Sequence, residues 1–151
     1  LNKAKKFDCE IILPSDVVCS KNVNDKSNLV ECNISQVSQD QMILDLGKKS
    51  IKLIEKYISK SNMILWNGPL GAFEFTPFEK SSVKIANLIK IKFKSSNIAT
   101  IAGGGDTLSL IKLAKAKEGF SYMSKAGGAF LEWLEGNESP GIIALKKNIN
   151  N

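Results

Sequence analysis

The chain of 151 residues contains no histidine and only three cysteines, Cys9, Cys19 and Cys32. Without histidine, its own residues cannot form a Ser–His or Cys–His nucleophilic pair or a histidine metal site. The cysteines are odd in number and lack C-x-x-C spacing, so neither a disulfide framework nor a zinc site is indicated. This pattern is typical of reduced thiols, and the predicted location is the cytoplasm.

Long apolar runs and a concentrated basic patch are also missing. No apolar stretch approaches membrane-spanning length, so we expect no membrane association. The net charge is +6, but the lysines are dispersed and not interleaved with aromatic residues, which favours a solvated face over nucleic-acid binding. An anionic small-molecule substrate fits the charge equally well. With 43% hydrophobic and 24% charged residues, the composition is that of one globular domain.

The start of the sequence resembles the interior of a fold. Residue 1 is leucine, residues 3–6 predict the end of a helix, and residues 10–13 predict a buried strand. We therefore expect these residues to be a piece of a longer protein.

Hydrophobic periodicity predicts alternating strands and helices along most of the chain. A polar surface excursion with one strand or hairpin covers residues 20–39. The predicted strands are 16–19, 62–66, 97–102 and 120–124, and the predicted helices are 50–58, one beginning near 77, 107–116 and one that ends at Gly136. Repeated strand–glycine loop–helix units indicate an α/β fold with a parallel sheet, whose ligands bind at the carboxyl ends of the strands.

Three glycine-containing loops should therefore lie along one sheet edge: WNGPLGAFE (66–74), AGGGDT (102–107) and SKAGGAF (124–130). In AGGGDT, glycines let the backbone lie against a ligand, and the N–H groups of the following helix suit phosphate. Asp106 is a possible Mg²⁺ ligand, and Thr107 is a possible phosphate contact. The loop is not a Walker A motif. A tight turn with Asp106 near the helix cap is the structural alternative.

The other two loops have comparable alternatives. In WNGPLGAFE, Gly71 gives backbone access, the apolar residues around it could line a flat aromatic ligand, and Glu74 suits paired ribose hydroxyls. It could equally be an ordinary loop with Phe73, Phe75 and Phe78 in the core. SKAGGAF offers a second anion cradle at a helix start or close helix–strand packing.

Taken in order, WNGPLGAFE, AGGGDT and GGAFLEWLEG resemble the C-terminal half of the nucleotide-binding domain of the phosphoglycerate kinase family, as do LPSDVV, ILDLG and SPGIIAL. The resemblance implies a Rossmann-like, three-layer α/β/α parallel sheet. Residues 1–139 would be part of the nucleotide-binding domain. Residues 140–151 would be the tail that packs back on the family's N-terminal domain.

The resemblance also implies a reaction: reversible, Mg²⁺-dependent phosphoryl transfer from 1,3-bisphosphoglycerate to ADP, giving 3-phosphoglycerate and ATP in glycolysis. The transfer would be direct and in line. By position, the resemblance implies that Pro69 forms part of the pocket wall and that Glu74 binds the ribose hydroxyls. Asn67 and Thr107 would contact the phosphates, Gly104 and Gly105 would bind them through the backbone, and Asp106 would coordinate Mg²⁺. Gly105, Gly127 and Gly128 would stabilise the phosphoryl group during its transfer.

Two local departures from the family pattern stand out. Lys125–Ala126 replaces a common Thr-Gly, and Gly47–Lys48 replaces a common Gly-Pro, which we expect to adjust a helix start. The family's N-terminal domain, which holds 3-phosphoglycerate on basic residues, and the segment with its catalytic lysine are not among these residues. We therefore expect the chain alone to be inactive and to bind nucleotide weakly, and the full-length parent to be a monomer. A non-catalytic nucleotide-binding α/β module and a degenerate split-gene remnant are the alternatives.

Overall fold

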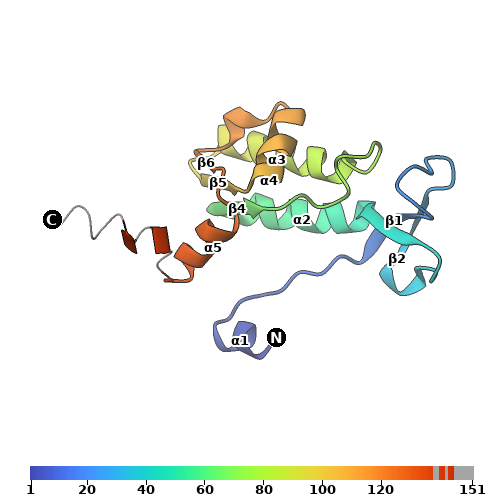
Figure 1. Cartoon of the computed structure of the whole chain (residues 1–151), viewed down its shortest axis with the longest axis horizontal. Helices are drawn as coiled ribbons and strands as arrows, with labels where there is room; N and C mark the ends of the chain where they lie inside the picture. The colour runs from blue at the N-terminus through green and yellow to red at the C-terminus, as the bar shows by residue number, and fades with distance from the viewer. Residues whose placement is uncertain (138–139, 142, 145–151) are drawn as a thin grey trace. The chain divides into compact units, whose positions relative to one another are not determined.

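The computed structural model describes residues 1–137, 140–141 and 143–144, which divide into two compact units. The first unit comprises Leu1–Ser59 and Leu70–Ile85. The second comprises Lys60–Pro69 and the described residues from Ala86 onward. Each unit contains one three-stranded sheet, and Figure 1 labels the helices and most of the strands.

The first unit is built on an antiparallel sheet with strand order β2-β1-β3. Its elements are α1 (Asn2–Lys6), β1 (Asp16–Ser20), β2 (Val30–Asn33), a 3₁₀ turn (Ile34–Gln36), β3 (Met42–Leu46) and α2 (Lys48–Lys60). The central strand β1 is almost completely buried, whereas β2 is an exposed edge strand. Sequence periodicity predicted β1 and a strand within 20–39, but it did not predict β3 or the antiparallel pairing.

Side chains from the two strands β1 and β2 cap the start of α2. The Asp16 carboxylate accepts hydrogen bonds from the backbone N–H of Lys49 at 2.9 Å and of Ser50 at 2.6 Å. Glu31 accepts one from the backbone N–H of Lys48 at 2.9 Å. Burial opposes ionisation of Asp16, but the hydrogen bonds outweigh it and lower its pKa. Lysine at position 48 makes the Glu31 contact possible, because proline has no N–H to donate. The replacement of Gly-Pro by Gly47–Lys48 thus affects the start of a helix.

The second unit contains the parallel sheet, with strand order β4-β5-β6. Its strands are β4 (Met63–Asn67), β5 (Ala99–Gly103) and β6 (Tyr122–Ser124), and its helices are the part of α3 (Lys80–Ser95) from Ala86 on, α4 (Gly105–Leu113), a 3₁₀ turn (Lys117–Gly119) and α5 (Gly128–Leu134). Fully buried Ala102, Leu110 and Ile111 lie in its core. This parallel sheet with its helices confirms the predicted α/β class.

Two predictions about local structure were wrong. Residues 10–13 form no strand, and Ile11 and Leu13 are 48% and 70% exposed. An apolar run becomes a strand only where a neighbour pairs with it; here Ile12, Leu13 and Pro14 instead line a small apolar cavity. Helix α3 begins at Lys80, not near residue 77, because turns precede it and the Asp45 carboxylate accepts the backbone N–H of Ser81 at 3.0 Å.

Among the described residues, no helix combines the length and apolar character needed to cross a bilayer. Of the predicted tail, residues 142 and 145–151 lie outside the described part of the chain.

Candidate functional site

The three parallel strands of the second unit end at the same level. Register pairs Asn67 of β4 with Gly103 of β5, and Gly103 with Ser124 of β6. We call this row of strand ends the carboxyl edge. The segments that follow, beginning at Gly68, Gly104 and Lys125, therefore start side by side, as predicted. Residues 70–74 of the first loop belong to the first unit.

At the carboxyl edge, backbone from two loops packs around the Asn67 side chain. A Cβ atom added to Gly103, Gly104 or Gly127 would lie 3.3 Å from Asn67 Oδ1 in each case. A Cβ on Gly127 would also lie 3.2 Å from the Gly104 Cα. Gly104 has φ +92°, a conformation that favours glycine, and its N–H donates to the Ser124 carbonyl at 3.0 Å. Gly127 therefore fits the alternative interpretation of SKAGGAF, in which glycine is needed for close packing.

Two helices begin at this edge without a side-chain cap. Helix α4 starts at Gly105 and α5 at Gly128, and neither start has a side-chain capping hydrogen bond. Both glycines are exposed, and a Cβ on either would meet no atom within 4 Å. Uncapped helix starts present backbone N–H groups and the positive end of the dipole. Asp106 lies exposed in the first turn of α4 and does not cap it.

Thr107 is buried rather than displayed at the edge, with only 1% of its surface exposed. Its hydroxyl oxygen accepts a hydrogen bond from the backbone N–H of Gly68 at 2.7 Å. Gly68 has φ +100°, and its carbonyl accepts the Trp66 indole N–H at 2.6 Å. The hydroxyl thus holds the loop after β4 against the first turn of α4. Nothing in the sequence spacing indicated this contact.

The remaining residues of WNGPLGAFE differ in their surroundings. Pro69 is half-buried and follows Gly68 in the second unit, whereas Glu74 is exposed on a turn of the first unit. A Cβ on Gly71 would lie 2.5 Å from Asp45 Oδ1 and 2.6 Å from the Phe78 carbonyl, so glycine is required there by packing. Phe78 is completely buried, as the core alternative predicted, whereas Phe75 is 40% exposed and does not lie in the core.

Asp45 is a buried carboxyl that sequence reasoning did not single out. It is 4% exposed and accepts hydrogen bonds from Ser81 Oγ and from the backbone N–H of Ser81 and Leu46. Burial raises its pKa against the effect of these hydrogen bonds, and repulsion from Glu79 adds to the increase. The only indication of this buried carboxyl in the sequence is that Asp45 is a single acidic residue within the apolar run ILDL.

The described residues contain no group of three or more potential metal-ligating His, Cys, Asp or Glu side chains. The exposed carboxylate of Asp106 therefore belongs to no such group. Such a site does not suit a metal held by protein alone. It does suit Mg²⁺, which commonly uses one or two carboxylates together with substrate phosphates and water. The donor set at the carboxyl edge therefore fits a magnesium–phosphate ligand.

Comparison with known proteins extends over nearly the whole chain. The family described as Phosphoglycerate kinase matches residues 1–137. The phosphoglycerate kinase of Chelativorans sp. is 40% identical over 144 residues, covering 95% of this chain and 36% of the relative. That of Zymomonas mobilis is 43% identical over 143 residues, with the same coverage of 95% and 36%. The chain thus spans little more than a third of the length of these relatives.

Solved structures show the same relationship. The phosphoglycerate kinase from Coxiella burnetii matches with a TM-score of 0.80 and 32% identity, over 90% of this chain and 34% of that chain. The enzyme from Pyrococcus horikoshii matches with a TM-score of 0.73 and 26% identity, over 96% and 35%.

Proposed function

The chain belongs to the phosphoglycerate kinase family, and on that premise we propose that it supplies part of the nucleotide site for this kinase reaction. The reaction is reversible phosphoryl transfer from 1,3-bisphosphoglycerate to ADP, in the glycolytic pathway of the cytoplasm. The observation that carries the proposal is the carboxyl edge, where two uncapped helix starts and the Asn67 side chain meet.

In this proposal, backbone N–H groups of the chain hold the phosphates. Gly104 and Gly105 lead into α4, and Gly127 and Gly128 lead into α5, so both helix dipoles favour negative charge at the carboxyl edge. Among the described residues, none forms a hydrogen bond with the side-chain amide of Asn67. This side chain is therefore proposed to bind a phosphate oxygen. Lys125, exposed at the entrance to α5, adds positive charge where the family often has a hydroxyl.

Asp106 is the residue proposed to hold Mg²⁺, because it is an exposed carboxylate in the first turn of α4. When bound, the ion neutralises charge on the phosphates. Thr107 is proposed to contact the terminal phosphate in the family's manner; its hydroxyl also orients the loop through Gly68. Pro69, in the second unit, is proposed to contact the nucleoside. The ribose role of Glu74, which lies in the first unit, rests on the family resemblance alone.

Preorganised donors of this kind suit phosphoryl transfer, which needs positioning and charge stabilisation more than covalent chemistry. The lack of histidine is therefore no obstacle, and direct in-line transfer needs no nucleophile from this chain. By the family resemblance, the 3-phosphoglycerate-binding domain and the catalytic lysine would lie outside these residues. The 151 residues alone are accordingly proposed to bind nucleotide weakly without turnover, as a non-catalytic nucleotide-binding module would.

Calorimetric titration with ADP, in Mg²⁺ and then in a chelator, tests the nucleotide assignment. We expect a Kd weaker than about 100 μM, with tighter binding in Mg²⁺ than in chelator. Asp106→Ala should remove the magnesium dependence. Glu55→Ala removes an exposed carboxylate from α2 and serves as the matched control, which should bind as the wild type does.

Binding in the micromolar range that survives Asp106→Ala would contradict the metal-ligand assignment. A coupled assay addresses turnover separately. Formation of ATP from 1,3-bisphosphoglycerate and ADP by the purified 151 residues would refute the proposed inactivity.

A further inference from the structure

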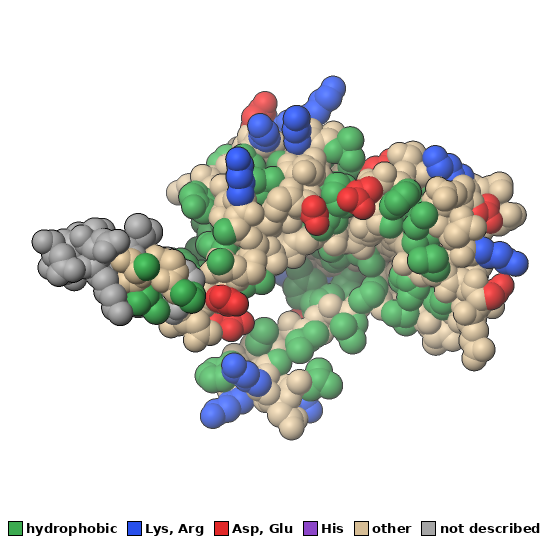
Figure 2. All heavy atoms as spheres, in the orientation of Figure 1, with side chains coloured by type: hydrophobic (Ala, Val, Ile, Leu, Met, Phe, Trp, Pro, Cys, Tyr) green, Lys and Arg blue, Asp and Glu red, His purple; other side chains and the backbone are tan. Residues whose placement is uncertain are grey.

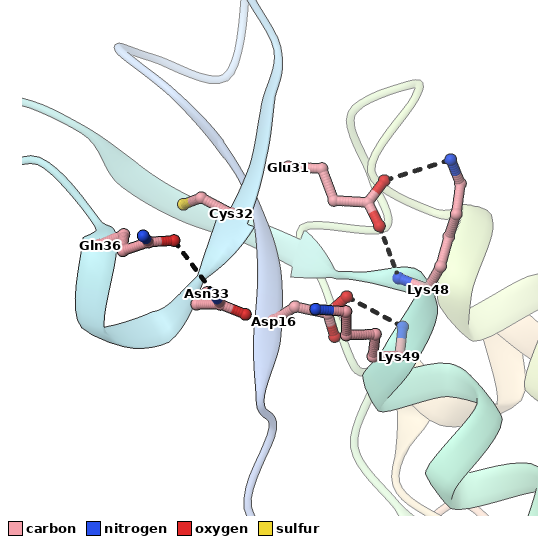
Figure 3. A pocket seen from close by; sticks show the side chains of 7 residues that line it. All are labelled: Asp16, Glu31, Cys32, Asn33, Gln36, Lys48 and Lys49. Atoms are coloured by element: carbon pink, nitrogen blue, oxygen red, sulfur yellow. Dashed lines mark hydrogen bonds and ion pairs between the residues drawn. The ribbon is translucent and has the colours of Figure 1, made fainter.

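Cys19 and Cys32 share one face of the antiparallel sheet in the first unit. The register pairs Val17 with Cys32 and Cys19 with Val30. Side chains two residues apart on a strand lie on the same face, so the two cysteines are diagonal neighbours across β1 and β2. Cys19 is completely buried, whereas Cys32 is half-buried and lines a cavity of about 370 Å³ at the start of α2 (Figure 3).

We propose that Cys19 and Cys32 form a reversible disulfide, a redox modification site independent of the nucleotide function. Diagonal neighbours in antiparallel strands have Cα atoms roughly 7–8 Å apart, and a disulfide needs about 4.4–6.8 Å. The strands must therefore approach by about 1 Å. The short edge strand β2 can make this movement, because among the strands that the structure describes it pairs with β1 alone.

The accessibility of the two thiols sets the order of the chemistry. Burial raises the pKa of the Cys19 thiol, and the neighbouring Cys32 thiol raises it further through charge repulsion and a hydrogen bond. Cys32, open to the cavity, therefore reacts first. Its thiolate attacks a small-molecule disulfide and displaces one thiolate, leaving a mixed disulfide on Cys32. Cys19, after losing its proton, attacks the Cys32 sulfur and displaces the second thiolate. Overall, two protein thiols are oxidised and one disulfide is reduced to two thiols.

The bridge would act on the start of α2 through Glu31, the residue before Cys32. Glu31 accepts the backbone N–H of Lys48 and pairs with the Lys48 Nζ at 3.4 Å. Figure 3 shows both contacts, with the Cys32 side chain extending from β2 in the other direction. Drawing β2 toward β1 changes the position of this carboxylate. A bridge that requires movement of the backbone is readily reduced again, as expected of a responsive site rather than a structural disulfide.

The test uses the full chain in a Cys9→Ser background, which removes the exposed third thiol. The folded protein is treated with oxidised glutathione, and free thiols are then blocked. Non-reducing mass spectrometry should show the loss of two hydrogen atoms. Lys21 and Lys26 lie between the cysteines, so trypsin separates the two cysteine peptides, which should remain joined until a reductant is added.

Single variants test the order of the steps. Cys19→Ser should accumulate the mixed disulfide with glutathione at Cys32. Cys32→Ser should lower the rate of thiol oxidation in the folded protein at least about tenfold, because the remaining Cys19 thiol is buried. In denaturant, where Cys19 is accessible, its thiol should be oxidised as fast as the thiols of the unfolded parent protein. The proposal is overturned if the Cys9→Ser protein yields only the mixed disulfide, only linked dimers, or no oxidation. Because this decisive result comes from a chain that retains both cysteines, misfolding of a single variant does not affect it.

Discussion

Gly68 donates its backbone N–H to the Thr107 hydroxyl oxygen at 2.7 Å, which joins the loop after β4 to the first turn of α4. The contact is partly buried, because Thr107 is 1% exposed and Gly68 is half-buried. Two of the loops that begin at this edge are therefore fixed to one another without any ligand. Such preorganisation lowers the cost of binding, because the loops need not be ordered when a phosphate arrives.

Removal of the Thr107 hydroxyl should destabilise the fold. Thr107→Val keeps the shape but leaves the Gly68 N–H without its acceptor in a partly buried place, which should cost about 1–3 kcal/mol of unfolding free energy. Thr107→Ser keeps the acceptor and should lose less. Urea unfolding measures both variants. A loss in Thr107→Ser as large as that in Thr107→Val would contradict the expected dominance of the hydrogen bond, because Thr107→Ser removes only the methyl group.

Neighbouring glycines should respond differently to alanine. Gly104 has positive φ, and a Cβ there would lie 3.3 Å from Asn67 Oδ1, so Gly104→Ala should cost about 1–3 kcal/mol. Gly105 begins α4 with open space around its Cβ position, so Gly105→Ala should change the unfolding free energy by less than about 1 kcal/mol. Thermal unfolding of the matched pair tests this, and similar losses at both positions would contradict the described backbone.

The Asp45 carboxyl should make stability depend on pH. Its pKa is raised by burial above the ordinary value of 3.8. The folded chain thus retains a proton that the unfolded chain releases. Stability from this group is present below pH 3.8 and is lost as pH rises through the folded pKa.

Asp45→Asn should therefore reduce the decline in unfolding free energy as pH rises from about 4 toward 7. Urea unfolding across this range provides the measurement. Asp8→Asn, which removes an exposed carboxyl, is the control and should keep the wild-type slope. An unchanged slope in Asp45→Asn would show that Asp45 is not the group responsible.

The parts of the fold that the sequence predicted are those with strong local signals. Continuous apolar runs followed by glycine marked β4 and β5, a pattern typical of strands in a parallel sheet. The expectation that both faces are covered fails for β4, where Met63 and Leu65 are 63% and 39% exposed. The same signal failed at residues 10–13, since an apolar run does not reveal whether a neighbouring strand exists to pair with it. Strand β3 was missed because its pairing with β1 is a long-range contact.

The candidate site shows the same limit. The glycine spacing predicted that the loops after β4, β5 and β6 start at one edge, which the register confirms. The motif could not distinguish Asp106, which is exposed, from Thr107, which is buried. That difference depends on Gly68, a residue far away in sequence. The roles assigned to Asn67 and Glu74 in nucleotide binding stay predictions.

The most direct test of the nucleotide assignment is a heteronuclear NMR titration of the isotope-labelled chain with Mg²⁺ and ADP up to millimolar concentrations. We expect one saturable event in which five amide signals shift together: those of Gly104, Gly105, Asp106, Gly127 and Gly128. Shifts confined to other residues, such as those at the start of α2, would contradict it, as would the absence of any shift at these five amides.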